Sequence, residues 1–182
     1  LTASSCSPSR SSIITGRYPH NLGRAAELHE PIAARLPWFP RLLRDAGYHT
    51  ALVGKNHMSA EPPADGKPAE PPAFAAISKG SGPGNRGGHG DWVQTVRERP
   101  RDKPFFFWFA ALDAHRDWDG DDDWRADLYG AKHDPGAGDV PPFLVDDAAT
   151  RADLASFRNE VTRFDHFAGA VVAELEQQSL LD

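Results

Sequence analysis

Five residues of this 182-residue chain carry side chains that could do chemistry: one thiol, two cations and two imidazoles, at Cys6, Arg10, Lys55, His57 and His115. Cys6 and Arg10 frame the run Cys-Ser-Pro-Ser-Arg, and a Thr-Gly pair follows at residues 15–16. Lys55 and His57 come directly after one predicted strand, and His115 follows another. Ligands of open α/β sheets bind at the carboxyl ends of strands. By residue type alone, however, a lone cysteine is more often buried beside a turn, and a strand-end lysine or histidine is more often solvated.

The elements that must position these residues alternate between helix and strand. Residues 4–16 predict a turn that leads into a helix, and residues 31–46 predict an irregular turn and then a helix that ends at Gly47. Residues 48–53 predict a short buried strand, and residues 91–99 a helix. The unbroken apolar run at residues 105–112 predicts a strand buried on both faces. Residues 146–181 are apolar at helical period, so the fold class is α/β.

Two segments that are rich in proline and glycine, residues 61–90 and 117–142, are predicted to be surface loops. The chain opens without a methionine and stops just after a periodic helix. We therefore expect residues 1–182 to be part of a single domain that is truncated at both ends. The sequence contains no internal repeat.

Composition excludes several classes of protein. The chain has 26 acidic and 20 basic residues, a formal charge of −6, and no stretch that concentrates lysine and arginine, so nucleic acid is not an expected partner. The single cysteine rules out an internal disulfide and a CxxC zinc or iron–sulfur site. The longest apolar run is far shorter than the roughly 20 residues that span a bilayer.

The run from Cys6 to Arg10, with its downstream Thr-Gly pair, resembles the signature of the type I sulfatases, Cys-x-Pro-Ser-Arg followed by Thr-Gly or Ser-Gly. In that family a formylglycine-generating enzyme oxidises the cysteine to Cα-formylglycine, an aldehyde that hydrates to a geminal diol. One hydroxyl attacks sulfur and expels the alcohol or amine; the other then loses its proton, and collapse to the aldehyde releases sulfate. The resemblance implies that Cys6 is the nucleophile precursor and that Arg10 holds the diol and screens its charge.

Two further segments are similar to the same family. Residues 47–57 look like the second sulfatase signature, Gly-Tyr-x-Thr and then Gly-Lys-x-His, with Asn56 where an aromatic residue is usual. This resemblance implies that Lys55 binds sulfate oxygens and that His57 hydrogen-bonds the diol. Residues 104–116 resemble the family strand that ends in Pro-His, with Ala114 in place of the proline. His115 would then be a general acid for the leaving group or a sulfate ligand. The remaining histidines match no catalytic position of the family: His20, His29, His49, His89, His133 and His166.

The resemblance also implies an alkaline-phosphatase-like fold, a largely parallel sheet flanked by helices, and one divalent cation, Ca²⁺ or Mg²⁺. Formylglycine at position 6 would be one ligand of the cation. The family's Asp-Asp and Asp-Asn or Asp-His pairs have no match in place, so we expect the remaining ligands outside this chain. The acidic run at residues 121–123 reads as a solvated loop tip. Without those pairs, we expect the 182 residues alone to be inactive.

Within the family, the resemblance is closest to the heparan N-sulfatase, or sulfamidase, branch, which implies a sulfated small molecule or glycan as substrate. Two alternatives remain open. The chain could belong to a phosphonate or phosphate ester hydrolase of the same superfamily, or it could be a non-catalytic piece that binds an oxyanion or a glycan. The sequence does not reveal the compartment; family analogy suggests the periplasm or the outside of the cell.

Overall fold

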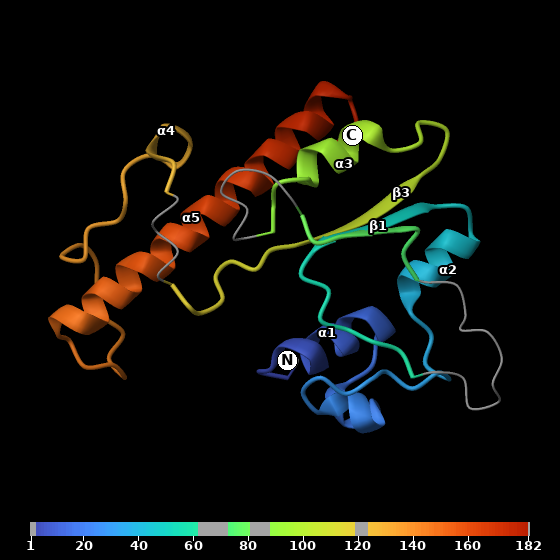
Figure 1. Ribbon diagram of the computed structural model, residues 1–182, viewed down its shortest axis with the longest axis horizontal. Coiled ribbons are helices and arrows are strands. Elements are labelled where there is room, and N and C mark those ends of the chain that lie inside the picture. Colours follow the sequence, from blue (N-terminus) through green and yellow to red (C-terminus); the bar gives the residue numbers. More distant parts are fainter. Residues whose placement is uncertain (1–2, 62–72, 81–87, 119–123, 182) are drawn as a thin grey trace. The chain divides into compact units, whose positions relative to one another are not determined.

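The computed structural model describes residues 3–61, 73–80, 88–118 and 124–181, and its elements alternate between helix and strand as expected of an α/β protein (Figure 1). In chain order they are α1 (Cys6–Thr15), the 3₁₀ turns η1 (Pro19–Asn21) and η2 (Gly23–Ala26), α2 (Phe39–Asp45), β1 (His49–Gly54), β2 (Ala76–Ser78), α3 (Trp92–Glu98), β3 (Phe105–Ala110), α4 (Ala126–Tyr129) and α5 (Ala148–Gln177).

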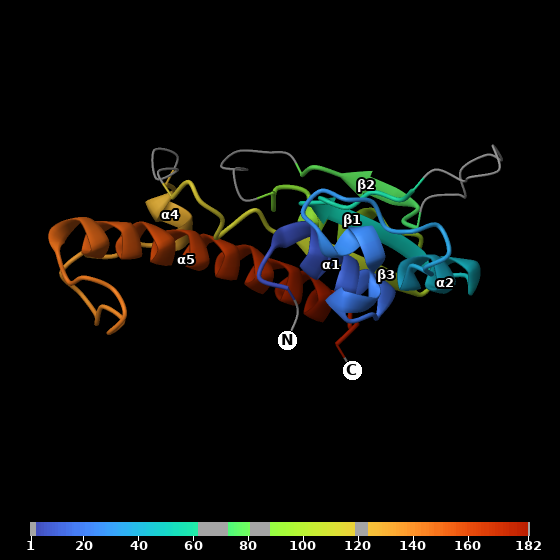
Figure 2. The same ribbon diagram turned by 90° about the horizontal axis from the view of Figure 1, so that it is seen from below.

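The three strands form one sheet in the order β2-β1-β3, with β1 in the centre (Figure 2). β1 and β3 run parallel. At their beginnings the His49 N–H donates to the Pro104 carbonyl over 2.8 Å, and at their ends the Lys55 N–H donates to the Ala110 carbonyl over 2.8 Å. The carboxyl ends of β1 and β3 therefore lie at the same edge of the sheet, as the sequence predicted.

The two parallel strands differ in burial. All residues of β1 after His49 are buried, which confirms the predicted buried strand. The prediction that residues 105–112 are buried on both faces is wrong, because Phe105 to Phe109 are only half-buried and Ala110 alone is fully buried. The reason is the place of β3 at the edge of the described sheet, where it has a neighbour on one side only.

The predicted helices are present, and their ends follow the local chemistry. α1 starts at Cys6 after Ser5 and ends at Gly16, whose φ of 66° provides the left-handed cap. The predicted helix before Gly47 is α2, which begins with Pro40 in its first turn. α5 begins where the Asp147 side chain accepts a hydrogen bond from the Thr150 N–H over 2.8 Å.

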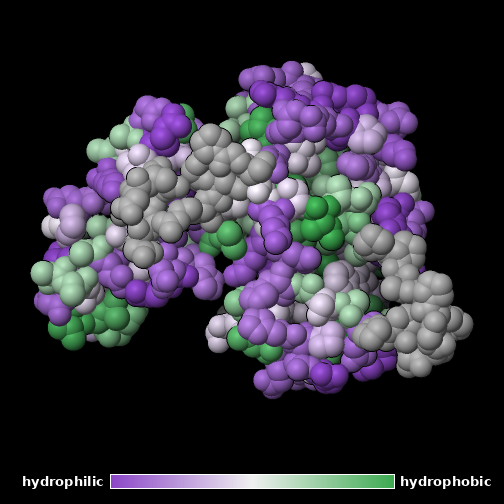
Figure 3. Space-filling view, in the orientation of Figure 1, coloured by the Kyte–Doolittle hydropathy of each residue, from purple (hydrophilic) through white to green (hydrophobic). Residues whose placement is uncertain are grey.

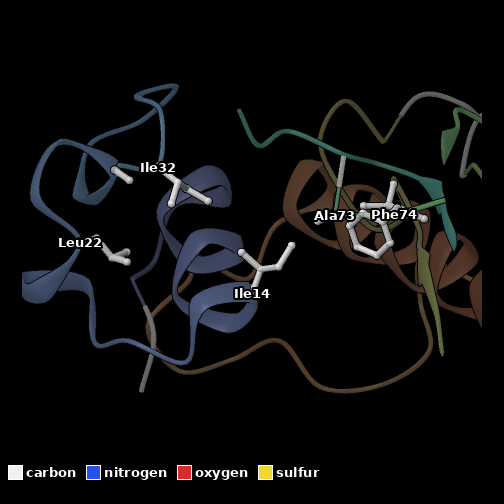
Figure 4. Close-up of a cluster of buried hydrophobic side chains, with 7 residues drawn as sticks. Ile14, Leu22, Ile32, Ala73 and Phe74 are labelled. Carbon is white, nitrogen blue, oxygen red and sulfur yellow. The ribbon is translucent and has the colours of Figure 1, made fainter. Parts of the chain in front are cut away.

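Contacts divide the chain into two compact units: unit 1 comprises residues 1–52, 56–77 and 99–108, and unit 2 comprises residues 53–55, 78–98 and 109–182. In unit 1 an apolar cluster joins α1 to the 3₁₀ turns, β1 and the segment before β2 (Figure 4). Its buried members are Ile14, Leu22, Ala25, Ile32, Leu52, Ala73 and Phe74. This cluster fixes the helix that carries Cys6 against the strand that precedes His57.

Unit 2 is built around Trp92, the first residue of α3, which is 2% exposed. Its ring stacks on Phe109 with the centroids 5.3 Å apart and meets Phe164 of α5 edge-on at 6.1 Å. The Trp92 indole N–H donates to the Val53 carbonyl of β1 over 3.3 Å. Figure 1 shows α3 lying along the C-terminal half of α5, and the two helices are in contact.

The two predicted loops differ from each other. The described part of residues 61–90 is not merely a surface loop, since it contains β2 and buries Ala73, Phe74 and His89. Residues 124–142 are mostly exposed, as predicted for a surface loop, but they include the short helix α4, which was not predicted. Residues 119–123, with the acidic run, lie outside the described residues. The face shown in Figure 3 is largely hydrophilic, in keeping with a mean hydropathy of −0.54. Among the described residues, no helix combines the length and the apolar character that crossing a membrane requires.

Candidate active site

Cys6 and Arg10 lie on α1, four residues apart, so their side chains share one face of the helix. Cys6 is the first residue of the helix, and its thiol is free and half-buried. The pKa of the Arg10 guanidinium lies below its ordinary value because burial disfavours the cation, and negative charge at Cys6 opposes that lowering. An arginine stays charged at any working pH, so a fixed cation stands beside position 6.

Arg10 is held by two contacts that use different parts of its guanidinium. Its Nε–H donates to the Asn56 backbone carbonyl over 2.7 Å. Its guanidinium carbon lies 4.6 Å from the centre of the Trp108 ring on β3, a cation–π contact. The Asn56 side chain takes no part in the bond to Arg10. The departure of residue 56 from the family pattern therefore does not affect this contact.

His57 follows Asn56 and packs on a histidine that the sequence did not single out. The rings of His57 and His29 lie 4.7 Å apart between centroids, tilted by 46°. The backbone N–H of His29 donates to the Ser7 hydroxyl over 2.7 Å. Ser7 follows Cys6 directly, so these contacts connect the start of α1 to His57. Nothing in the spacing of His29 could have indicated this.

Lys55 and His115 belong to unit 2, whereas Cys6, Arg10 and His57 belong to unit 1. Lys55 emerges where β1 pairs with the end of β3, through its N–H bond to Ala110. His115 is exposed in a turn after β3, where its N–H donates to the Leu112 carbonyl over 2.9 Å and its Nδ1 contacts the Arg116 carbonyl. The structure thus brings three of the five predicted residues together in one unit and places the other two at strand ends of the second.

Unit 2 also contains a buried polar cluster centred on Asp113. The Arg163 guanidinium of α5 donates to both carboxylate oxygens, over 2.8 Å to Oδ2 and 2.7 Å to Oδ1. His89 Nε2 lies 3.0 Å from the Oδ2 atom. Burial alone would raise the pKa of Asp113, but Arg163 and then His89 outweigh it and hold that pKa below its ordinary value. Asp113 is therefore ionised, and its bonds to Arg163 fix the backbone two residues before His115. The sequence motifs did not single out Asp113, and its partners His89 and Arg163 carried no signal.

A complete cation site does not emerge from the described part of the chain. Across residues 3–61, 73–80, 88–118 and 124–181, no group of three or more His, Cys, Asp or Glu side chains could hold a metal ion. The described residues therefore do not fit a full ligand set for Ca²⁺ or Mg²⁺, and we derive no chemical step through a cation.

Comparison with known proteins relates the N-terminal part of the chain to one family. The family model described as sulfatase matches residues 1–80. This match covers 80 of the 182 residues, a little under half of the chain. This sulfatase segment contains Cys6, Arg10, Lys55 and His57, whereas His115 lies beyond it. The α/β elements around it agree with the predicted alkaline-phosphatase-like class.

Curated relatives extend the similarity beyond the sulfatase segment. The whole chain is similar to N-sulphoglucosamine sulphohydrolase of Homo sapiens, at 28% identity, and spans 40% of that protein's length. Shorter matches are to N-acetylglucosamine-6-O-sulfatase of Bacteroides thetaiotaomicron, 40% identical over 30% of this chain and 10% of that protein, and to steryl-sulfatase of Homo sapiens, 41% identical over 29% of this chain and 11% of that protein. The chain therefore spans well under half the length of each of these sulfatases.

Proposed function

We propose that this chain is part of a hydrolase that cleaves sulfate esters or sulfamates of a sulfated glycan through a formylglycine hydrate made from Cys6. The observation that carries the proposal is the Cys-Ser-Pro-Ser-Arg run at the start of α1, inside the sulfatase segment, with Arg10 held beside Cys6. The half-buried thiol at the first residue of a helix suits the modification, since it lies at the protein surface rather than in the core.

The diol at position 6 supplies the nucleophile and the group whose collapse releases sulfate. Arg10 orients its hydroxyls and balances the negative charge that gathers around them. Lys55 binds the sulfate oxygens as a point charge, and His57 hydrogen-bonds the diol. His115 donates a proton to the departing oxygen or nitrogen, so that the alcohol or amine leaves neutral.

A glycan substrate is supported by the names of two relatives, which refer to N-sulphoglucosamine and N-acetylglucosamine. The first covers the whole chain, including the loops that follow β1 and β3, so a sulfamate is the substrate class we favour. The match to steryl-sulfatase covers only 29% of this chain. Sulfatases generally use formylglycine and one divalent cation. We propose Ca²⁺ or Mg²⁺, with formylglycine 6 as one ligand and the others outside the described residues.

The test uses a longer polypeptide that contains this chain at the length of its relatives, co-expressed with a formylglycine-generating enzyme. We expect it to hydrolyse N-sulfoglucosamine or 4-nitrophenyl sulfate faster than 4-nitrophenyl phosphate. Replacing Cys6 with alanine removes the nucleophile, so turnover should fall at least about 1,000-fold. Ser12→Ala, on the same helix but outside the signature, serves as the matched control.

Three results would overturn the proposal. Faster turnover of the phosphate ester would favour the phosphonate or phosphate hydrolase. Binding of sulfated glucosamine without turnover of any sulfate ester or sulfamate would favour the non-catalytic piece. Full activity of Cys6→Ala would exclude position 6 as the nucleophile.

A further inference from the structure

The backbone around His29 and His57 adopts a conformation that side chains rarely take. His29 has φ of 67° and His57 has φ of 53°, so both residues lie in the left-handed region. Histidine tolerates this region better than bulky apolar residues do, but each such residue carries a cost that its surroundings must offset. Two such residues whose rings touch 4.7 Å apart indicate that the surrounding contacts hold this arrangement in place.

The first of these contacts fixes His29 to the nucleophile segment. The Ser7 hydroxyl accepts the His29 backbone N–H over 2.7 Å, and Ser7 is only 2% exposed. A buried hydroxyl that accepts a backbone N–H satisfies both groups, and losing it would leave the N–H without its partner. Ser7 occupies the variable position of the Cys-x-Pro-Ser-Arg run. In this chain the residue at that position, Ser7, therefore helps to fix the backbone of His29.

The second contact fixes the backbone next to His57. Arg10 donates to the Asn56 carbonyl over 2.7 Å, so α1 holds the segment after β1 directly. Three contacts therefore link α1 to the segment after β1. Ser7 accepts the His29 N–H, the His29 ring packs on the His57 ring, and Arg10, on the same helix turn as Ser7, donates to the carbonyl of Asn56. All of these residues belong to unit 1.

We propose that His29 is a positioning residue that holds the His57 imidazole beside the nucleophile of the proposed sulfatase. This inference rests on the proposed function. His29 acts through ring packing on His57, and neither an acid nor a base at position 29 is required. A loss of packing lets the His57 ring turn away from the diol, and a displacement of about 1 Å at a reacting group costs up to about 100-fold in rate.

The glycine variant separates the ring of His29 from its backbone. Glycine adopts a φ near 67° without strain and keeps the N–H that bonds to Ser7, so His29→Gly removes the ring alone. We expect kcat per formylglycine to fall about 10- to 100-fold, with KM changed less than threefold and no loss of thermal stability. The control is His20→Ala, an exposed histidine of the same unit that stacks on Tyr18 instead.

A spectroscopic readout tests the contact without relying on turnover. In protein labelled with ¹³C at histidine Cε1, removing the His29 ring should shift the His57 resonance, whereas His20→Ala should leave it in place. A His57 resonance that does not move in His29→Gly would overturn the contact. A resonance that moves without any fall in kcat would overturn the positioning role.

The two proposals fail separately. If fully modified wild-type protein hydrolyses neither sulfate esters nor sulfamates, the proposed function fails, and the positioning role for that reaction fails with it. The His57 resonance then still reports whether His29 fixes the imidazole. If the wild-type protein is active and His29→Gly is equally active, only the inference about His29 fails.

Discussion

Replacing Asp113 with alanine should destabilise the protein strongly, because it removes the counter-charge closest to a buried cation, Arg163. The side chains of Asp113 and Arg163 are each 3% exposed, and two hydrogen bonds of 2.8 and 2.7 Å join them. Removing one partner of such a pair typically costs about 3–5 kcal/mol. Glu160, 3.9 Å from Arg163, supplies some residual negative charge, so we expect a value near the lower end.

Urea unfolding followed by circular dichroism measures this loss. A loss of about 3 kcal/mol corresponds to a fall in Tm of about 6–12 °C for a chain of this size. Asp146→Ala is the matched control, since Asp146 pairs with Arg151 on the surface and its loss should be barely measurable. Asp113→Asn keeps the shape of the side chain and tests the charge itself. A loss below about 1 kcal/mol in Asp113→Ala would refute the reasoning that the pair is buried and essential.

The pKa of Asp113 determines how the difference in unfolding free energy between the wild type and Asp113→Ala depends on pH. Because the folded-state pKa lies below the ordinary aspartate value of about 3.9, the stabilisation by the carboxylate is fully present above that pH. It is lost as pH falls through the lower folded-state pKa. The stability difference between wild type and Asp113→Ala should therefore stay constant from neutral pH to about pH 4 and shrink in stronger acid. A difference that vanished already at neutral pH would contradict the assignment of an ionised Asp113.

Two further outcomes follow from the geometry around the strand end and the nucleophile. Gly54→Ala would place a Cβ 2.0 Å from the Ala110 carbonyl oxygen at a φ of 107°, so it should cost at least about 3 kcal/mol in urea unfolding. Gly169→Ala, in α5 with open space around it, should instead stabilise by about 0.5–1 kcal/mol, and equal effects would contradict the predicted clash. Arg10→Lys keeps the positive charge but loses the planar set of guanidinium N–H donors, so sulfate ester turnover per formylglycine should fall at least about tenfold. The control Arg17→Lys should retain the turnover of the wild type.

The order and type of the elements could be predicted because each rests on local chemistry. Gly16 and Gly47 mark helix ends, and the alternation before Gly54 marks a buried strand. The parallel sheet was expected from the family resemblance, because a long connection permits parallel pairing without requiring it. The short strand β2 escaped prediction, because three residues inside a stretch rich in proline and glycine carry no periodicity.

Only the site residues that lie within recognisable sequence motifs could be predicted. Cys6, Arg10 and His57 fall in two recognisable segments, and unit 1 holds all three. His29 contacts the site through its ring and its backbone N–H, and residue spacing predicts neither contact. Arg163 lies 50 residues from Asp113, and only the packing of α5 brings the two together. Tertiary contacts of this kind are set by how elements pack, which no local pattern encodes.

The most direct test of the account is mass spectrometry of the peptide that contains Cys6, taken from the longer polypeptide made together with a formylglycine-generating enzyme. The account predicts that position 6 carries the aldehyde or its hydrate, and that Ser12→Ala leaves this conversion intact. An unmodified Cys6 thiol, found while a control sulfatase in the same cells is converted, would contradict it.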